Sequence, residues 1–175
     1  LSANSSASIS RSRDKLRALQ LIGNIGVEMP ITGYVHLSRD IESVLNTVGK
    51  PPFVIKLLEG TQGRGVVLTE TMGAAISAIE TMKKIDANIL IQEFISEANG
   101  EDIRAIVVGD EVVASMKRIA KPGEFRSIVH LGGRVEDYKL TDQEKECAIR
   151  AAKVLGLSVA GVDLIQSDRG PLVLE

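Results

Sequence analysis

The sequence predicts an α+β fold built from two lobes, and two observations lead to this prediction. An early segment, residues 53–84, has the pattern of strand, loop, strand and helix, whereas residues 88–118 and 158–175 form a later series of antiparallel strands. Apolar residues make up 44% of the 175 residues and charged residues 25%, so the chain can bury a core. We therefore expect two small lobes rather than a large multidomain enzyme.

Apolar spacing and end signals predict the helices. They are expected over residues 13–22, 38–48, 72–84 and 141–155. Thr71 can cap the third helix, and the fourth opens with a capping box, Thr141-Asp142-Gln143-Glu144. Residues 1–12 begin rich in Ser and Ala without periodicity, so we expect a linker there.

Short apolar segments predict the strands. They are expected over residues 53–58, 66–69, 88–95, 102–108, 111–118, 158–166 and 171–175, with a short extended piece at 29–32. Gly109-Asp110 fits a tight hairpin turn, and the polar segment 121–133 is long enough for a functional loop.

Charge and composition exclude several classes of protein. The net charge of −2 argues against a dedicated nucleic-acid binder. A single cysteine, Cys147, excludes an internal disulfide framework and fits a reducing, cytoplasmic compartment. No apolar run approaches the ~18 residues that span a membrane. The start lacks an initiating Met and an apolar signal core, so we expect an excised piece.

A glycine-rich loop is the first candidate site. Gly60, Gly63 and Gly65 lie between two predicted strands, whereas Walker and dinucleotide loops precede a helix. They predict a β-flap whose backbone N–H groups can approach phosphates, with an ordinary glycine-rich hairpin as the alternative. Lys56 carries a charge in the apolar strand beside the loop, which favours phosphate binding over a lysine that snorkels from a sheet edge.

Two acidic residues form the second candidate site. Asp163 interrupts an apolar strand, and Glu175 ends the next strand. A three-residue loop between the strands would place them directly opposite each other, and a bound Mg²⁺ would remove their repulsion. A two-residue loop would separate them.

Other polar residues lie at strand ends or in the later loop. Glu93 and Asp102 could accept hydrogen bonds from a ribose or base, and Arg104, Arg118 and Arg126 could neutralise phosphate or carboxylate groups. Taken singly, each is more typical of a structural residue. His36 and His130 have no metal-ligand spacing, and no nucleophile motif is present.

An ordered set of motifs resembles the ATP-grasp ligases, and within them the RimK group of α-L-glutamate ligases, which includes the ribosomal protein modification enzyme. The resemblance runs from about Ser10 to Glu175. Its motifs are Val54-Ile55-Lys56, Glu59-Gly60-Thr61-Gln62-Gly63-Arg64-Gly65-Val66, Gln92-Glu93-Phe94-Ile95, Asp102-Ile103-Arg104, Gly123-Glu124-Phe125-Arg126-Ser127, Gly161-Val162-Asp163 and Glu175.

The resemblance implies an ATP-grasp fold in which two lobes with antiparallel sheets hold ATP between them. It implies a linker at 1–12, an N-terminal lobe at 13–93 with the glycine flap at 59–65, and a C-terminal lobe at 94–175. Nucleotide-contacting positions of the family match Lys15, Lys56, the flap glycines, Glu93, Phe94, Asp102, Arg126 and Ser127. Its Mg²⁺ ligands, with Mn²⁺ as a substitute, match Asp163 and Glu175. Arg118 and Arg126 are the implied catalytic residues, with Arg118 near the transferring phosphate.

The implied reaction joins a carboxylate to an amine through an acylphosphate. The expected partners are ATP, glutamate and the C-terminal carboxylate of a peptide or protein such as a ribosomal protein, without nucleic acid or membrane, in a homo-oligomer of the full-length protein. The family also has an N-terminal domain before this segment and a metal-binding Asn after Glu175. We therefore expect a C-terminally truncated, inactive fragment. The alternatives are a non-catalytic nucleotide-binding module, a phosphotransferase, and a related ligase that acts on a lysine-biosynthesis carrier protein or a small cofactor.

Overall fold

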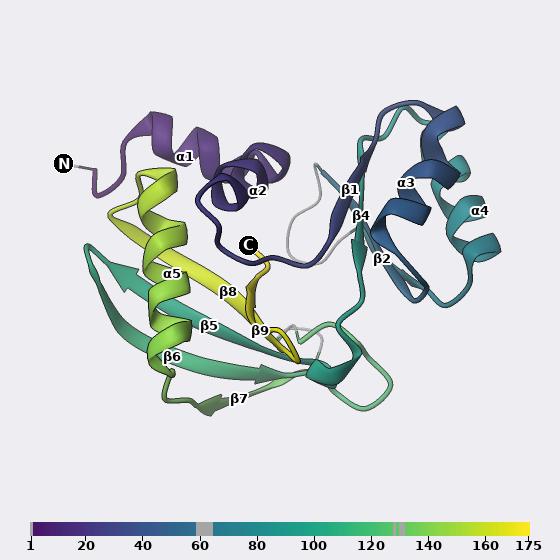
Figure 1. Cartoon of the computed structure of the whole chain (residues 1–175). Coiled ribbons are helices and arrows are strands. Elements are labelled where there is room, and N and C mark those ends of the chain that lie inside the picture. Colours follow the sequence, from purple (N-terminus) through teal and green to yellow (C-terminus); the bar gives the residue numbers. More distant parts are fainter. Residues whose placement is uncertain (1, 59–64, 128, 130–131) are drawn as a thin grey trace. The chain divides into compact units, whose positions relative to one another are not determined.

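The chain folds into two compact units, each with an antiparallel sheet and helices (Figure 1). This computed structural model describes residues 2–58, 65–127, 129 and 132–175. Pro30–Phe94 form one unit, which we call the four-stranded unit. Leu1–Met29 and Ile95–Glu175 form the other, which we call the five-stranded unit. The predicted α+β fold is confirmed.

The four-stranded unit has the strand order β1-β4-β2-β3. Its strands are β1 (Thr32–Val35), β2 (Phe53–Leu57), β3 (Val66–Thr69) and β4 (Ile89–Glu93), and its helices are η1 (Ser38–Asp40), α3 (Ile41–Val48) and α4 (Met72–Lys83). Alternation along β2 and β4 sends one set of side chains to the helices. This set includes Phe53, Ile55, Ile89 and Ile91, which are fully buried in one cluster with residues of α3 and α4. The opposite face of the same two strands carries Lys56 and Gln92.

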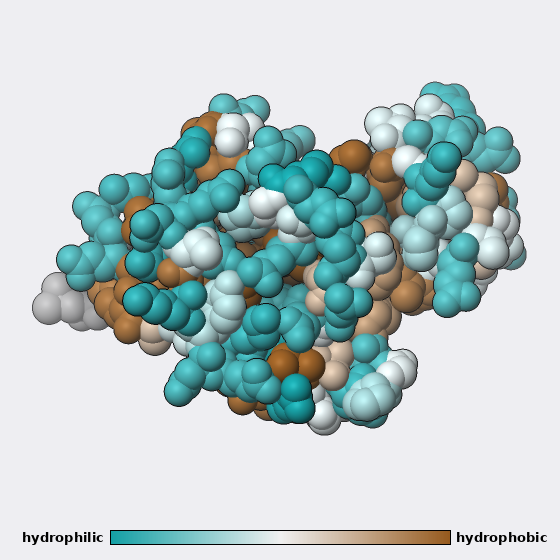
Figure 2. Space-filling model, turned by 60° about the horizontal axis from the view of Figure 1, so that its bottom comes forward, coloured by the Kyte–Doolittle hydropathy of each residue, from teal (hydrophilic) through white to brown (hydrophobic). Residues whose placement is uncertain are grey.

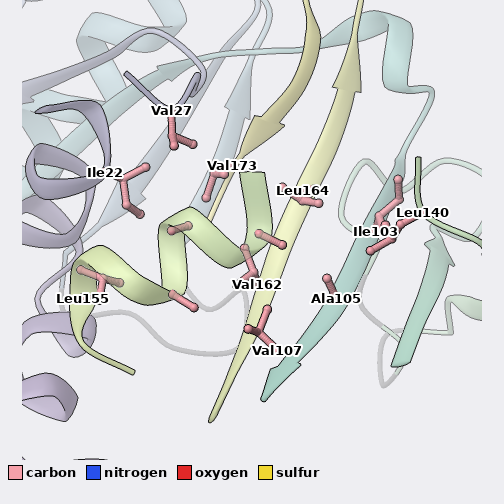
Figure 3. Packing of buried hydrophobic residues seen from close by; sticks show 13 residues of the cluster. Ile22, Val27, Ile103, Ala105, Val107, Leu140, Leu155, Val162, Leu164 and Val173 are labelled. Carbon is pink, nitrogen blue, oxygen red and sulfur yellow. The ribbon is translucent and has the colours of Figure 1, made fainter. Parts of the chain in front are cut away.

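The five-stranded unit has the strand order β7-β6-β5-β8-β9. Its strands are β5 (Glu101–Val108), β6 (Glu111–Ile119), β7 (Arg134–Asp137), β8 (Val159–Ser167) and β9 (Gly170–Val173). Its helices are α1 (Ser6–Arg13), α2 (Lys15–Asn24), η2 (Ser96–Ala98) and α5 (Asp142–Leu155). Figure 3 shows α5 lying over β5 and β8, with Leu155, Val162 and Val107 in the shared core.

Helix α5 begins and ends at the residues that the sequence predicts. Thr141 caps the first turn and forms the predicted capping box with Glu144, while Gly156 ends the helix in the left-handed conformation at φ 73°. Cys147 packs beside the core of this unit, and burial raises the pKa of its thiol. This agrees with a packing role for the cysteine.

The N-terminal segment differs from the expected linker. Residues 6–13 form α1, because Ser5 caps the helix by accepting a hydrogen bond from the Ser8 N–H. Asn4 then fixes this segment to β8: its side chain donates to the Val159 carbonyl at 2.8 Å and accepts from the Val159 N–H at 3.0 Å. Capping and docking compensate for the missing apolar periodicity, which is why the sequence pattern did not predict this helix.

The boundary between the units also differs from the expected lobes. Residues 13–29 were expected in the N-terminal lobe with 30–93, but they belong to the five-stranded unit. Ile22 and Val27 are buried in its core, and the Val173 N–H donates to the Glu28 carbonyl at 2.9 Å. Strand β7 was not predicted from the sequence. All four of its residues are exposed, so the segment lacks the apolar residues by which the other strands were predicted.

Among the residues that the structure describes, none of the helices has the length and apolar character that a membrane-spanning helix needs. Figure 2 shows hydrophilic residues over most of the visible face, with hydrophobic residues scattered among them.

Candidate functional site

Four charged residues lie on one face of the five-stranded sheet, and we call them the charge cluster: Asp102, Arg104, Arg118 and Asp163. On β5, Asp102 and Arg104 are two residues apart and therefore share a face, opposite the core residue Ile103. The sheet register pairs Asp102 with Arg118 on β6 and Arg104 with Asp163 on β8. Opposite charges thus face each other across two neighbouring strand pairs.

Both cross-strand pairs are bidentate. Arg118 donates from Nε to Oδ1 of Asp102 at 2.6 Å and from Nη2 to Oδ2 at 2.7 Å. Arg104 donates from Nε and Nη2 to the two oxygens of Asp163, each at 2.7 Å. A further contact of 2.8 Å joins Arg118 Nη2 to Asp163 Oδ2, so Asp163 is bound by both guanidinium groups. Such planar two-point pairing is the strongest form of a charge-assisted hydrogen bond.

Burial and charge act against each other in this cluster. The side chains of Asp102, Arg118 and Asp163 are only 10–13% exposed. Burial raises the pKa of Asp102, although Arg118 and Ser127 oppose this by hydrogen bonding to its carboxylate. Burial would lower the pKa of Arg118, but the hydrogen bonds and charges of the two aspartates outweigh it and raise this pKa above its ordinary value. The cluster therefore combines two basic and two acidic side chains, whose formal charges cancel.

A separate ion pair lies in the polar segment after β6. Glu124 accepts hydrogen bonds from Nε and Nη2 of Arg126 at 3.0 and 2.8 Å, and also from the Arg126 backbone N–H at 3.1 Å. These bonds lower the pKa of Glu124 to about 2. Ser127 is 7% exposed and hydrogen-bonds to Asp102, which links this segment to the charge cluster.

The turn between β8 and β9 decides between the two alternatives for Asp163 and Glu175. Ser167 pairs with Gly170, so the loop has two residues and the ladder does not place the two acids directly opposite each other. At the strand end, however, the Asp163 N–H donates to the Glu175 carbonyl and the Leu174 N–H donates to the Asp163 carbonyl, each at 2.8 Å. Asp163 thus faces both Leu174 and Glu175, the two-against-one pattern of a β-bulge.

The chemistry of these donors is compatible with a magnesium ion, whose preferred ligands are carboxylate oxygens. The carboxylate of Asp163 contacts two guanidinium groups, so its partners in the structure are cationic. Within the described residues, no group of three or more His, Cys, Asp and Glu side chains could hold a metal. Asp163 and Glu175 would therefore supply only part of a coordination sphere.

The second set of predicted residues lies in the four-stranded unit. Lys56 on β2 donates from Nζ to Oε1 of Gln92 on β4 at 2.6 Å. Gln92 is only 3% exposed, and its Nε2 donates to Oγ1 of Thr32 on β1 at 2.9 Å. Thr32 in turn donates to the Pro30 carbonyl at 2.8 Å. These hydrogen bonds connect three strands and fix the orientation of the Gln92 amide. They therefore fix the position of the amide oxygen that accepts from the Lys56 ammonium group.

Glu93 and Gly65 lie at the two ends of this sheet region. The Ile31 N–H donates to Oε1 of Glu93 at 2.8 Å, so the carboxylate that was expected near the nucleotide base already holds the start of β1. Gly65 has φ 74°, and a Cβ atom there would lie 2.7 Å from Cδ1 of Leu57. Only glycine fits this position. Gly60 and Gly63 lie outside the described residues.

The predicted site residues are divided between the two units. Lys56, Gly65, Glu93 and Phe94 belong to the four-stranded unit, and Lys15, Asp102, Arg118, Arg126, Ser127, Asp163 and Glu175 belong to the five-stranded unit. Lys15 is the first residue of α2. Sequence reasoning missed the pairing of Arg104 with Asp163 and the role of Gln92. The pairing of Arg104 with Asp163 could have been suspected, because each is a charged residue within an apolar strand and a sheet can place two such residues opposite each other.

Comparison with known proteins identifies the family. The family model described as a RimK-like ATP-grasp domain matches residues 12–175. The chain belongs to this family. A probable alpha-L-glutamate ligase from Picosynechococcus sp. is 58% identical over 174 residues, which cover 99% of the chain and 58% of that protein. The chain thus spans less than two thirds of the length of this relative.

Solved structures show the same fold as this RimK-like ATP-grasp domain. The D-alanine–D-alanine ligase from Bacillus anthracis in complex with ATP has a TM-score of 0.78 at 22% identity, covering 98% of this chain and 56% of that one. The ATP-grasp ligase PsnB complexed with a phosphomimetic variant of its minimal precursor, Mg and ADP has a TM-score of 0.75 at 23% identity, covering 99% and 52%. The expected ATP-grasp fold is confirmed.

Proposed function

We propose that this domain belongs to an ATP-dependent carboxylate–amine ligase that adds L-glutamate to the C-terminal carboxylate of a peptide or protein. The observation that carries the proposal is the 58% identity over 99% of the chain to a relative named as a probable alpha-L-glutamate ligase. A ribosomal protein is the acceptor that the sequence motifs favour.

The proposed roles of the residues follow their chemistry. Lys56 neutralises phosphate charge, and Gln92 supports it because a neutral amide oxygen holds the ammonium group without cancelling its charge. Lys15 and the flap glycines also contact phosphates. Glu93, Phe94, Asp102, Arg126 and Ser127 contact the nucleoside or support those contacts. Arg118 stabilises the charge that develops on the transferring phosphate.

Asp163 and Glu175 are the proposed ligands of Mg²⁺, with Mn²⁺ as a substitute. A bound ion of this kind neutralises phosphate charge and aligns the reacting groups. Before the ion binds, the carboxylate of Asp163 is held in position by two arginines, one from strand β5 and one from strand β6. These proposed ligands leave the remaining positions for phosphate oxygens and water.

The proposed reaction needs positioning and charge neutralisation rather than a protein nucleophile. The acceptor carboxylate attacks the γ-phosphorus of ATP, which forms an acylphosphate and releases ADP. The amino group of glutamate then attacks the acyl carbon, and inorganic phosphate leaves with one oxygen of the original carboxylate. The amine loses a proton in this step, and the product is an amide.

A mass-spectrometric screen of the full-length protein tests this proposal. With ATP and Mg²⁺, a peptide acceptor should gain one glutamate residue per ligation, and ADP should form in equal amount. Other amino acids at the same concentration should give little product. A phosphorylated peptide without an amide would indicate a phosphotransferase, and ATP binding without turnover for any acceptor would indicate a nucleotide-binding module.

A further inference from the structure

Asp163 has two cationic partners that are held very differently. The side chain of Arg118 is 13% exposed and binds Asp102 through two hydrogen bonds, so its contact with Asp163 is additional. The side chain of Arg104 is 40% exposed, and its hydrogen bonds within the described residues go to Asp163. If Asp163 bound another cation, Arg118 would remain fixed by Asp102. Arg104, the more exposed of the two arginines, would be released.

A metal ion on Asp163 would compete with these arginines. Both carboxylate oxygens accept hydrogen bonds at 2.7–2.8 Å, and Oδ2 accepts from both arginines. A divalent ion would add two positive charges beside two guanidinium groups that already share one carboxylate. Coulomb repulsion at such short range is strong in a partly buried site. One cation therefore has to leave. Arg104 is the more exposed arginine, and Arg118 is also held by Asp102, so we expect Arg104 to leave.

We propose that Arg104 and a divalent cation are alternative partners of Asp163. In the metal-free protein, Arg104 neutralises the buried carboxylate and keeps it in place. When the cation binds, Arg104 releases Asp163, while Arg118 stays bound to Asp102. This inference rests on the proposed metal role of Asp163, and it assigns to Arg104 a positioning role that the family comparison does not state.

Nuclear magnetic resonance of arginine side chains in the full-length protein tests the exchange directly. The Nε–Hε signals of Arg104 and Arg118 are assigned with the variants Arg104→Lys and Arg118→Lys. Without metal, both Hε protons should exchange slowly with water, because each donates to a carboxylate. Addition of Mg²⁺ with a non-hydrolysable ATP analogue should shift the Arg104 signal and speed its exchange, while Arg118 keeps its protection.

Mn²⁺ binding, followed by electron paramagnetic resonance, supplies the second measurement. Arg104→Gln should bind Mn²⁺ roughly two- to fivefold more tightly, because removal of a partly exposed competing pair has an effect of this size. It should also lower the metal-free unfolding temperature. Arg134→Gln removes an exposed arginine of β7 that contacts Glu136, and it should match the unaltered protein in both properties.

The outcomes separate this inference from the proposed function. Mn²⁺ binding with an unmoved Arg104 signal, or with unchanged or weaker affinity in Arg104→Gln, would overturn the exchange and leave the metal role of Asp163 intact. If the unaltered protein binds no Mn²⁺ with nucleotide, or if Asp163→Asn binds it equally well, both the metal role and the exchange are wrong. The signals of the unaltered protein decide the matter even if Arg104→Gln does not fold.

Discussion

Gln92 accepts a hydrogen bond of 2.6 Å from the ammonium group of Lys56, although the two residues lie 36 positions apart in the sequence. The antiparallel pairing of β2 with β4 brings them together on the sheet face opposite the helices. A buried amide that itself donates to Thr32 helps to position the lysine. Because this amide is neutral, its contact does not cancel the charge that we propose Lys56 offers to a phosphate.

Replacement of Lys56 tests this role. Lys56→Ala should weaken ATP binding to the full-length protein by about 1.5–3 kcal/mol, the range for a charge-assisted hydrogen bond. Isothermal calorimetry measures the change. Lys84→Ala is the matched control, because Lys84 lies exposed at the end of α4 and should leave the affinity unchanged. Equal affinity of the Lys56 variant and the unaltered protein would remove Lys56 from the nucleotide site.

Arg118 should be important for stability as well as for function. Arg118→Met leaves Asp102 and Asp163, both nearly buried, with too little positive charge, and it should cost about 3 kcal/mol of unfolding free energy. Urea denaturation measures this value. The exposed control Arg134→Met should change it by less than about 0.5 kcal/mol. A loss as small as that of the control would mean that the cluster does not hold the three strands together.

The ion pair of Glu124 and Arg126 predicts a pH dependence. Hydrogen bonds from Arg126 lower the pKa of Glu124 from 4.5 to about 2, so the folded state favours the ionised form. The resulting stability is complete above pH 4.5 and is lost as the pH falls toward 2. Glu124→Gln should therefore be less stable than the unaltered protein at pH 6, and the difference should shrink below pH 4.5.

Unfolding curves at several pH values measure this difference. Glu136→Gln is a suitable control, because Glu136 is an exposed acid that pairs with Arg134 on β7. Its unfolding free energy should follow that of the unaltered protein across the same range. A difference for Glu124→Gln that stays constant between pH 6 and pH 3 would contradict the proposed ionisation.

Two glycines should respond to alanine in opposite directions. At Gly156, φ is 73° and a Cβ atom would lie 2.8 Å from Arg11 Nη2 and 2.9 Å from Ser8 Oγ, so Gly156→Ala should cost more than about 1 kcal/mol of unfolding free energy. Gly73 lies in the first turn of α4 with open space around it, so Gly73→Ala should gain about 0.5 kcal/mol, the lower end of the range for a helix interior. Chemical denaturation compares the two variants, and a stabilised Gly156→Ala would show that α1 does not pack there.

The sequence predicted the elements whose signals are local. The Thr141 capping box, the cap at Thr71 and the hairpin turn at Gly109-Asp110 all appear in the structure, because each depends on neighbours along the chain. Helix α1 has no apolar stripe, so the sequence pattern did not predict it. Its formation depends on the cap at Ser5 and on the contacts of the N-terminal segment with β8.

The sequence singled out the residues of the candidate site, which stay a prediction, but it did not predict their contacts. Motif resemblance picked out Asp102, Arg118 and Asp163, yet the pairing of Arg104 with Asp163 depends on the register of β5 against β8. Likewise, the length of the turn at Asp168-Arg169 determines how Asp163 faces Glu175, and the sequence left both loop lengths open. Register and loop length are properties of the folded sheet rather than of any one segment.

Isotope transfer from the acceptor is the most direct test of the proposed ligase. The full-length protein is incubated with ATP, Mg²⁺, glutamate and a peptide whose C-terminal carboxylate carries ¹⁸O. With both oxygens of that carboxylate labelled, an acylphosphate route predicts one ¹⁸O atom in the released inorganic phosphate for each glutamate added. Amide formation with unlabelled phosphate, or phosphate release without a glutamyl product, would contradict it.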